Sequence, residues 1–294
     1  MFNVRMVAVC VLTAAVASAQ PAKAPAPKKA PTTRGTGTSA AGRVASPPVG
    51  TFRAKGPAVN PADVAALSGT DVELAAKAAE TLGANNGATA KDTLLDALAL
   101  GMPPEVAAPA IRSVALRPEA ADVPTLVRYA NHRNPSVRDA AIIALGAYTQ
   151  KEAQDKIIER IGDSVQIVRA TAATTASKAK MKAAIDPMMV LLARGEEGPA
   201  HALAAMADPD LARRLADQLG KVPDATLAMC LGEILVRADF GPDTARVEVV
   251  RAIGKIQDPA AVHALVDYLN ATPKTDKGTA RTEAQGIVTA RGGQ

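Results

Sequence analysis

Apolar residues along most of the chain recur at the spacing of helices rather than of strands. Val137, Ala140, Ala141, Ala144 and Leu145, for example, lie three or four positions apart or side by side, which is the pattern of one face of an α-helix. Strict alternation of apolar β-branched and polar residues, which marks a half-buried strand, is hard to find beyond residue 60. The pattern therefore predicts an all-α fold.

The helical pattern also repeats along the chain. The segment 134–141 (NPSVRDAA) returns as 164–172 (SVQIVRATA), so that the two Val-Arg dipeptides stand 31 residues apart. A Leu-Gly or Ile-Gly dipeptide recurs at residues 82, 145, 231 and 253, although the last two are only 22 residues apart. A period of this length is typical of helical repeat proteins, in which stacked hairpins bury a shared core.

Each repeat is predicted to contain two helices. The first is rich in Ala and ends at the Gly, for which we expect the left-handed conformation of a helix C-cap. The second carries bulkier residues, as in Val123, Leu126 and Val127 of one unit. An Asp-Pro or Asn-Pro dipeptide then supplies a cap and a first helical residue, and these dipeptides begin at residues 134, 186, 208 and 258.

Two segments resemble the short HEAT repeats that are also found in phycobiliprotein lyases. They are Asp163-x4-Val168-Arg169-x2-Ala172 and the stretch 252–265 (AIGKIQDPAAVHAL). The resemblance covers about residues 60–271, is weak from 178 to 225, and implies a right-handed α-solenoid of six or seven helical hairpins over residues 59–271. HEAT units pair an Asp with an Arg six positions later, which implies a structural pair of Asp163 with Arg169. Six positions before Arg138 the chain has His132 in place of an Asp, so the sequence does not identify the partner of Arg138.

The N-terminal and C-terminal segments differ from the repeats. Residues 1–19 contain Arg5, an apolar stretch and a final Ala-Ser-Ala, which predict a cleaved signal peptide and export to the periplasm or cell envelope. The stretch is shorter than the about 20 apolar residues that a membrane span needs, and an uncleaved anchor is the alternative. Residues 20–58 are rich in Pro, Ala and Lys, which predicts a disordered linker. We also expect a disordered tail over residues 272–294.

Charge is distributed unevenly between these segments. Residues 1–58 contain eight basic residues and no acidic one, which leaves 26 basic and 29 acidic residues, or −3, in the remainder. The net charge of +5 is therefore no argument for a nucleic-acid-binding domain. The basic linker is a candidate for contacts with anionic envelope polymers, and the alternative is that its Lys residues only keep it soluble.

Side chains suited to catalysis or metal binding are sparse. The three histidines, His132, His201 and His263, lie in separate repeats, and no HExxH motif is present. Once the signal peptide is removed, Cys230 is the only cysteine, and its apolar neighbours predict a buried and unreactive thiol. We therefore expect no enzymatic activity, no cofactor and no metal site.

A binding role remains, and the resemblance to HEAT repeats places it on the second helices, which line the concave face of such solenoids. Tyr129, His132 and Arg133 share a face at i, i+3 and i+4, and Arg160 lies on a neighbouring second helix. Tyr and Arg often anchor interfaces. The leading hypothesis is a protein-binding scaffold or adaptor of the envelope. The alternatives are a lyase or chaperone for a small ligand, and a cell-wall-binding protein that acts through the linker.

Overall fold

The computed structural model describes residues 57–273 and 275–292. These residues belong to one of the two units into which the contacts divide the chain, Arg53–Gln294. All their regular structure is helical, with fifteen α-helices, two short 3-10 helices and no strand, so the prediction of an all-α, HEAT-like solenoid is confirmed. The predicted signal peptide and the predicted linker up to residue 56 lie outside the described residues.

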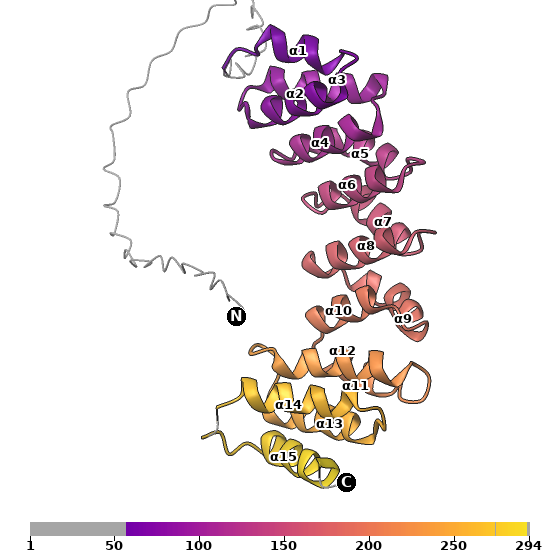
Figure 1. Cartoon of the computed structure of the whole chain (residues 1–294), viewed down its shortest axis with the longest axis vertical. Helices are drawn as coiled ribbons and strands as arrows, with labels where there is room; N and C mark the ends of the chain where they lie inside the picture. The colour runs from indigo at the N-terminus through magenta and orange to yellow at the C-terminus, as the bar shows by residue number, and fades with distance from the viewer. Residues whose placement is uncertain (1–56, 274, 293–294) are drawn as a thin grey trace, which may run out of the picture. The chain divides into compact units, whose positions relative to one another are not determined.

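Successive helices alternate between two layers, and each even-numbered helix contacts the next even-numbered one. Figure 1 shows this arrangement between α4 and α10, where even-numbered labels lie on one side of the stack and odd-numbered labels on the other. The even layer consists of α2 (Val72–Ala84), α4 (Pro104–Ala115), α6 (Pro135–Leu145), α8 (Gln166–Lys178), α10 (Glu197–Met206), α12 (Asp224–Val236) and α14 (Ala260–Ala271).

The odd-numbered helices complete the hairpins on the other side. They are α3 (Ala88–Leu100), α5 (Val123–Tyr129), α7 (Lys151–Arg160), α9 (Ile185–Ala193), α11 (Pro209–Ala216), α13 (Asp243–Lys255) and α15 (Thr279–Gly292). The first helix, α1 (Pro61–Leu67), precedes the hairpins and packs on α2. Two 3-10 helices, η1 (Ala120–Asp122) and η2 (Lys182–Ala184), lead into α5 and α9. The described residues thus contain seven hairpins from α2 to α15, in agreement with the expected six or seven.

Glycines allow the even helices to approach one another closely. A Cβ atom on Gly232 of α12 would lie 2.7 Å from the Cβ of Ala264 on α14, and one on Gly146 would lie 2.6 Å from a methyl group of Thr175. The expectation of left-handed caps at the four dipeptides that begin at residues 82, 145, 231 and 253 is wrong, because none of their glycines has a positive φ. The described glycines with positive φ are Gly101, Gly195, Gly220 and Gly241, and Gly101 is the C-cap residue of α3. Close packing between repeats, rather than turn geometry, explains the Gly of each dipeptide.

The Asx-Pro dipeptides play the predicted role at some positions only. Asn134 and Asp208 cap α6 and α11, because their side chains accept hydrogen bonds from the amides of Ser136 and Leu211. Asp186, in contrast, lies inside the first turn of α9. The same two-residue signal can therefore precede a helix or lie within it, and the helix that contains it, α9, directly follows the 3-10 helix η2.

An arginine near the start of several helices binds backbone carbonyls at the end of the preceding helix or in the turn that follows it. Arg138 and Arg169 do so on the even helices α6 and α8, whereas Arg246 and Arg281 do so on the odd helices α13 and α15. The sequence repeat therefore moves from one layer to the other between α8 and α13. This move explains the short spacing of 22 residues, since the two dipeptides concerned belong to the consecutive helices α12 and α13.

The helix α15 corrects the prediction of a disordered tail from residue 272. Ala280 and Ala284 are buried, and the helix packs on α13 and α14. The carboxylate of Asp243 accepts hydrogen bonds from the Thr279 and Ala280 amides at 2.9 and 3.3 Å. Arg291 donates to two backbone carbonyls of the α13 end. These partners stabilise a helix that its own sequence does not indicate.

Candidate functional site

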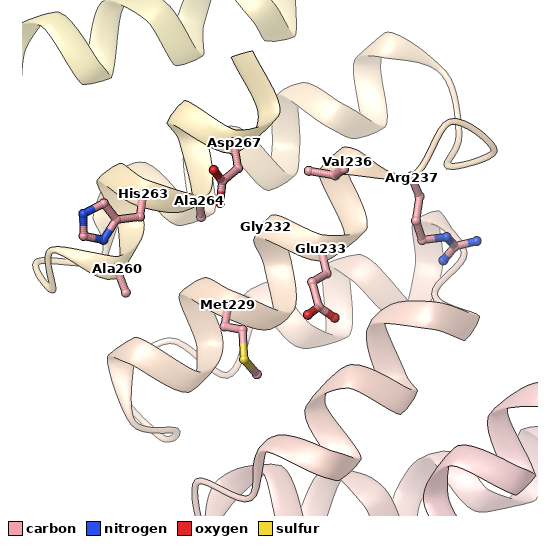
Figure 2. Close-up of a pocket in the computed structure, with 9 residues that line it drawn as sticks. All are labelled: Met229, Gly232, Glu233, Val236, Arg237, Ala260, His263, Ala264 and Asp267. Carbon is pink, nitrogen blue, oxygen red and sulfur yellow. The ribbon is translucent and has the colours of Figure 1, made fainter. Parts of the chain in front are cut away.

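The outer face of the even layer is hollowed between α12 and α14, and Figure 2 shows the residues that line this groove. Its volume is about 710 Å³. The floor is formed where Gly232 meets Ala264, because the missing side chain brings the two helices together. The lining residues are Met229, Gly232, Glu233, Val236, Arg237, Ala260, His263, Ala264 and Asp267. We call this site the α12/α14 groove.

One wall of the α12/α14 groove follows from the helical pattern of α12. Met229, Glu233 and Val236 stand at i, i+4 and i+7, on the side of α12 opposite its buried Leu231 and Ile234. Val236 keeps 45% of its surface exposed, so it presents an apolar side chain to the groove. The wall therefore combines two apolar side chains with one carboxylate.

The charges around the groove are mainly acidic. Oε1 of Glu233 lies 2.6 Å from Nδ1 of His201 on α10, and both side chains remain about half exposed. The side chains of His263 and Asp267, one turn apart on α14, form no hydrogen bond or ion pair with any described residue.

Arg237, at the end of the groove, already has partners for its side chain within the protein. It donates to the carbonyls of Ala204 and Ala207 and forms two hydrogen bonds to the carboxylate of Asp239. The hydrogen bonds from Arg237 hold the pKa of Asp239 below its ordinary value. The lining of the groove therefore contains two carboxylates, Glu233 and Asp267, and one arginine whose charge is paired with Asp239.

A second groove, of about 610 Å³, lies between α6 and α8 on the same layer. Its exposed apolar residues are Ile143 and Ile167, and the remaining lining consists of small or hydroxyl side chains with Lys178. The even layer thus offers two apolar depressions of similar size, and only the α12/α14 groove has carboxylates in its lining.

The predicted contact cluster is placed differently from the expectation. Tyr129 is buried, with 5% of its surface exposed, and its hydroxyl donates to the carbonyl of Leu98 at 2.7 Å; burial raises the pKa of this phenol. Because α5 ends at Tyr129, His132 and Arg133 lie in the turn that follows and not on its face. The expected helical face is therefore wrong, and Tyr129 is a packing residue between α3 and α5.

His132 and Arg133 have separate surroundings. The His132 ring stacks on Tyr129, with ring centroids 6.1 Å apart, and its Nδ1 accepts from the amide of Asn134. His132 also borders a hollow of about 310 Å³ beside Leu100, and Arg133 is exposed. Arg160 is engaged in ion pairs with Glu159 and Asp163. Of the four predicted contact residues, Arg133 alone is exposed and has no ion pair with another described residue.

The ion pairs between neighbouring units differ from the pair that the resemblance to HEAT repeats implies. Asp163 pairs with Arg138 of the preceding unit, and Arg169 pairs with Glu196 of the following unit. Arg169 binds Asp163 only through the backbone carbonyl, so the implied Asp163–Arg169 side-chain pair is wrong. Lys91 of α3 and Asp122 of η1 form another buried pair. These pairs join neighbouring hairpins.

Groups suited to chemistry were also located in the structure. Cys230 is buried, as predicted, and burial raises the pKa of its thiol to about 12. Across residues 57–273 and 275–292, no group of three or more His, Cys, Asp or Glu side chains is arranged to hold a metal ion. No helix among the same residues has the length and hydropathy of a membrane span.

Among the residues that line the α12/α14 groove, only His263 was named from the sequence, and not as part of a site. A signal was present, since Met229 and Val236 are apolar residues on the polar side of an otherwise well-patterned helix. Their importance depends on α14, which lies across the groove from them and more than 20 residues later in the chain. Only the stacking of the two helices turns these residues into one surface.

Comparisons with known proteins agree with this architecture. Residues 92–177 match the model of HEAT repeats, and residues 245–271 match that of the PBS lyase HEAT-like repeat. The complex of CpcE and CpcF of phycocyanin lyase from Nostoc sp. PCC7120 is similar at 21% identity, over 83% of this chain and 99% of that chain, with a TM-score of 0.43.

A second similar structure is human deoxyhypusine hydroxylase in complex with glycerol. It has 16% identity, covers 80% of this chain and 96% of that chain, and has a TM-score of 0.36. At these identities the similarity concerns the fold alone. No curated protein matches the sequence.

Proposed function

We propose that this protein is a non-enzymatic scaffold that binds another protein through the outer face of its even-numbered helices. The observation that carries the proposal is the α12/α14 groove, which combines an exposed Val236 with the unengaged carboxylate of Asp267. Exposed apolar depressions with polar rims are typical of protein interaction sites. The proposed binding face lies on the layer opposite to α5 and α7, which carry the expected contact residues Tyr129 and Arg160, although α14 is itself the second helix of the matched repeat at residues 245–271.

The test is capture from an envelope extract by the full chain and two matched variants. Val236→Lys places a cation in the α12/α14 groove, and Ile143→Lys does the same in the groove between α6 and α8. Both residues are about half exposed and lie in the last turn of their helix, where a cation is favourable for the helix dipole. Loss of a partner with either variant, at unchanged melting temperature, supports the proposal; capture unchanged by both contradicts it.

We also propose that the protein acts after export, in the periplasm or cell envelope. The support is the signal-peptide pattern of residues 1–19. The intact mass of the protein from the exported fraction tests this point. A chain that begins at Gln20 is the expected result, whereas a chain that retains Met1, or its absence from that fraction, contradicts it.

A small-ligand lyase or chaperone is the second candidate function. The volume of the α12/α14 groove, about 710 Å³, lies in the range of small-molecule pockets, and part of the chain matches a repeat named after lyases. Thermal-shift measurements with the low-molecular-mass fraction of the extract distinguish the two. A shift that Val236→Lys abolishes favours the small ligand.

The third function, cell-wall binding through the basic linker, is tested by removing residues 20–58. Binding to purified cell-wall polymer that disappears with this deletion, and that is insensitive to Val236→Lys, favours that function. The linker-dependent contact is electrostatic in this hypothesis, so it should weaken as the salt concentration rises.

A further inference from the structure

The chemistry of the α12/α14 groove restricts what can occupy it. We propose that its occupant is an amphipathic α-helix of the partner protein, with an aliphatic side chain over Gly232 and Ala264 and with Lys or Arg side chains beside Glu233 and Asp267. This inference rests on the proposed function and specifies the partner's chemistry. It follows from the floor, the backbone and the charges of the groove, taken in turn.

The floor of the groove fits an aliphatic side chain. Gly232 and Ala264 leave a depression that is bordered by the half-buried Met229 and by Val236. No aromatic residue lines the groove. Recognition of polyproline segments relies on aromatic-lined grooves, whereas amphipathic helices insert aliphatic anchors between the side chains of a helical surface. The lining therefore favours an aliphatic anchor over a Pro-rich peptide.

The backbone of the groove favours a helical occupant. The groove lies along α12 and α14, whose amides and carbonyls are used within the helices. An extended peptide would present unpaired amides and carbonyls to a surface without a free strand edge, and unpaired backbone groups are costly to bury. A helix satisfies its own backbone hydrogen bonds, so it can cover an apolar floor without needing backbone partners.

The charges favour a basic occupant. Asp267 has no hydrogen bond or ion pair with any described residue, and Glu233 has only the half-exposed His201 as partner. The one Lys or Arg in the lining, Arg237, is held by Asp239 and two carbonyls. A Lys or Arg that lies over the groove would therefore meet two carboxylates on opposite helices. An acidic helix would be repelled by both carboxylates.

The protein's own basic segment is a poor candidate for this site. Residues 20–58 supply positive charge, but Pro or Gly interrupts them repeatedly, as at Pro25, Pro27, Pro31, Gly35 and Gly37. Such a sequence lacks the uninterrupted helical spacing of aliphatic and basic residues that the proposed occupant needs. The occupant must then come from another chain, and a peptide of residues 20–58 becomes a control in the test.

The test selects binders from a randomised 16-residue peptide library against the immobilised full chain. Peptides whose binding is lost with Val236→Lys but kept with Ile143→Lys report on the α12/α14 groove. We expect these peptides to lack Pro, to become helical when bound, and to carry net positive charge next to aliphatic residues. Their affinity should fall at least tenfold with the double variant Glu233→Gln, Asp267→Asn, because two charge-assisted contacts are removed.

A charge-reversal experiment completes the test. Asp267→Lys should weaken a selected basic peptide and strengthen the same peptide with its Lys and Arg replaced by Glu. Groove-dependent peptides that are acidic or Pro-rich, or a residue 20–58 peptide that competes with them, would overturn the inference. If the selected peptides depend on Ile143 and not on Val236, the inference is wrong while binding by the even layer stands.

Discussion

Arg138 of α6 and Asp163, in the turn before α8, form a buried two-point ion pair that links consecutive hairpins. Nε of Arg138 lies 2.9 Å from Oδ2 of Asp163, and Nη2 lies 2.7 Å from Oδ1. The backbone carbonyl of Asp163 in turn accepts a hydrogen bond from Arg169. One residue between two hairpins is therefore bound by the arginine of each, which fixes how the second hairpin stacks on the first.

Removal of the Asp163 carboxylate should destabilise the protein strongly. Asp163→Ala leaves the buried Arg138 guanidinium without its counterion, and breaking a buried pair in this way typically costs about 3–5 kcal/mol. Urea unfolding measures the loss in the free energy of unfolding. The matched control is Glu248→Ala, which breaks an exposed pair with Arg213. The free energy of unfolding should not change measurably in this control. Equal losses in the two variants would contradict a stabilising role of the buried Arg138–Asp163 pair.

The same pair should make stability depend on pH in the acidic range. Burial alone would raise the pKa of Asp163, but the hydrogen bonds from Arg138 and the Val165 amide, with the nearby arginine charges, outweigh it and lower the pKa. The contribution of the ionised Asp163 carboxylate to the free energy of unfolding is therefore complete above the unfolded-state pKa of about 3.9. This contribution is lost as the pH falls through the folded-state pKa of Asp163. The difference in free energy of unfolding between wild type and Asp163→Asn should narrow below about pH 4. A difference that stays constant with pH would contradict a lowered pKa of Asp163 in the folded protein.

Two glycine-to-alanine substitutions should have opposite effects. Gly232→Ala places a Cβ 2.7 Å from Ala264, so α12 and α14 must separate, at a cost of about 1–3 kcal/mol. Gly286→Ala, within α15, meets no atom within 4 Å and should stabilise the helix by about 0.5–1 kcal/mol. Melting temperatures of the two variants measure the contrast, and a lower melting temperature for both would contradict it.

Tyr129 and Arg133 should separate into a packing residue and a surface residue. Tyr129→Phe removes the hydrogen bond to the Leu98 carbonyl and should cost about 0.5–1.5 kcal/mol in stability. Arg133→Ala should leave the melting temperature unchanged. Partner capture by the two variants tests the original contact prediction, and reduced capture with Arg133→Ala alone would support a binding role for that residue.

The cap on α15 should contribute measurably to stability. Asp243→Ala removes the acceptor for the Thr279 and Ala280 amides, and loss of such a cap typically costs about 1 kcal/mol. Asp243→Asn retains an acceptor and should lose less. Hydrogen exchange of residues 279–292 measures the effect directly; fast exchange of these amides in the wild-type protein would contradict the observed helix.

The periodic pattern by itself determined the fold class, because apolar residues at helical spacing with a period near 31 residues have to be buried by stacking. It also predicted the burial of Cys230 and the caps at Asn134 and Asp208, which depend on neighbours in the chain. Tertiary structure alone decided the rest. The partner of Arg138, the helix α15 and the α12/α14 groove each require contacts between residues about 25 to 40 positions apart. Local propensity carries no information about such contacts. Which of them form also depends on the layer in which each repeat begins, and this layer changes between α8 and α13.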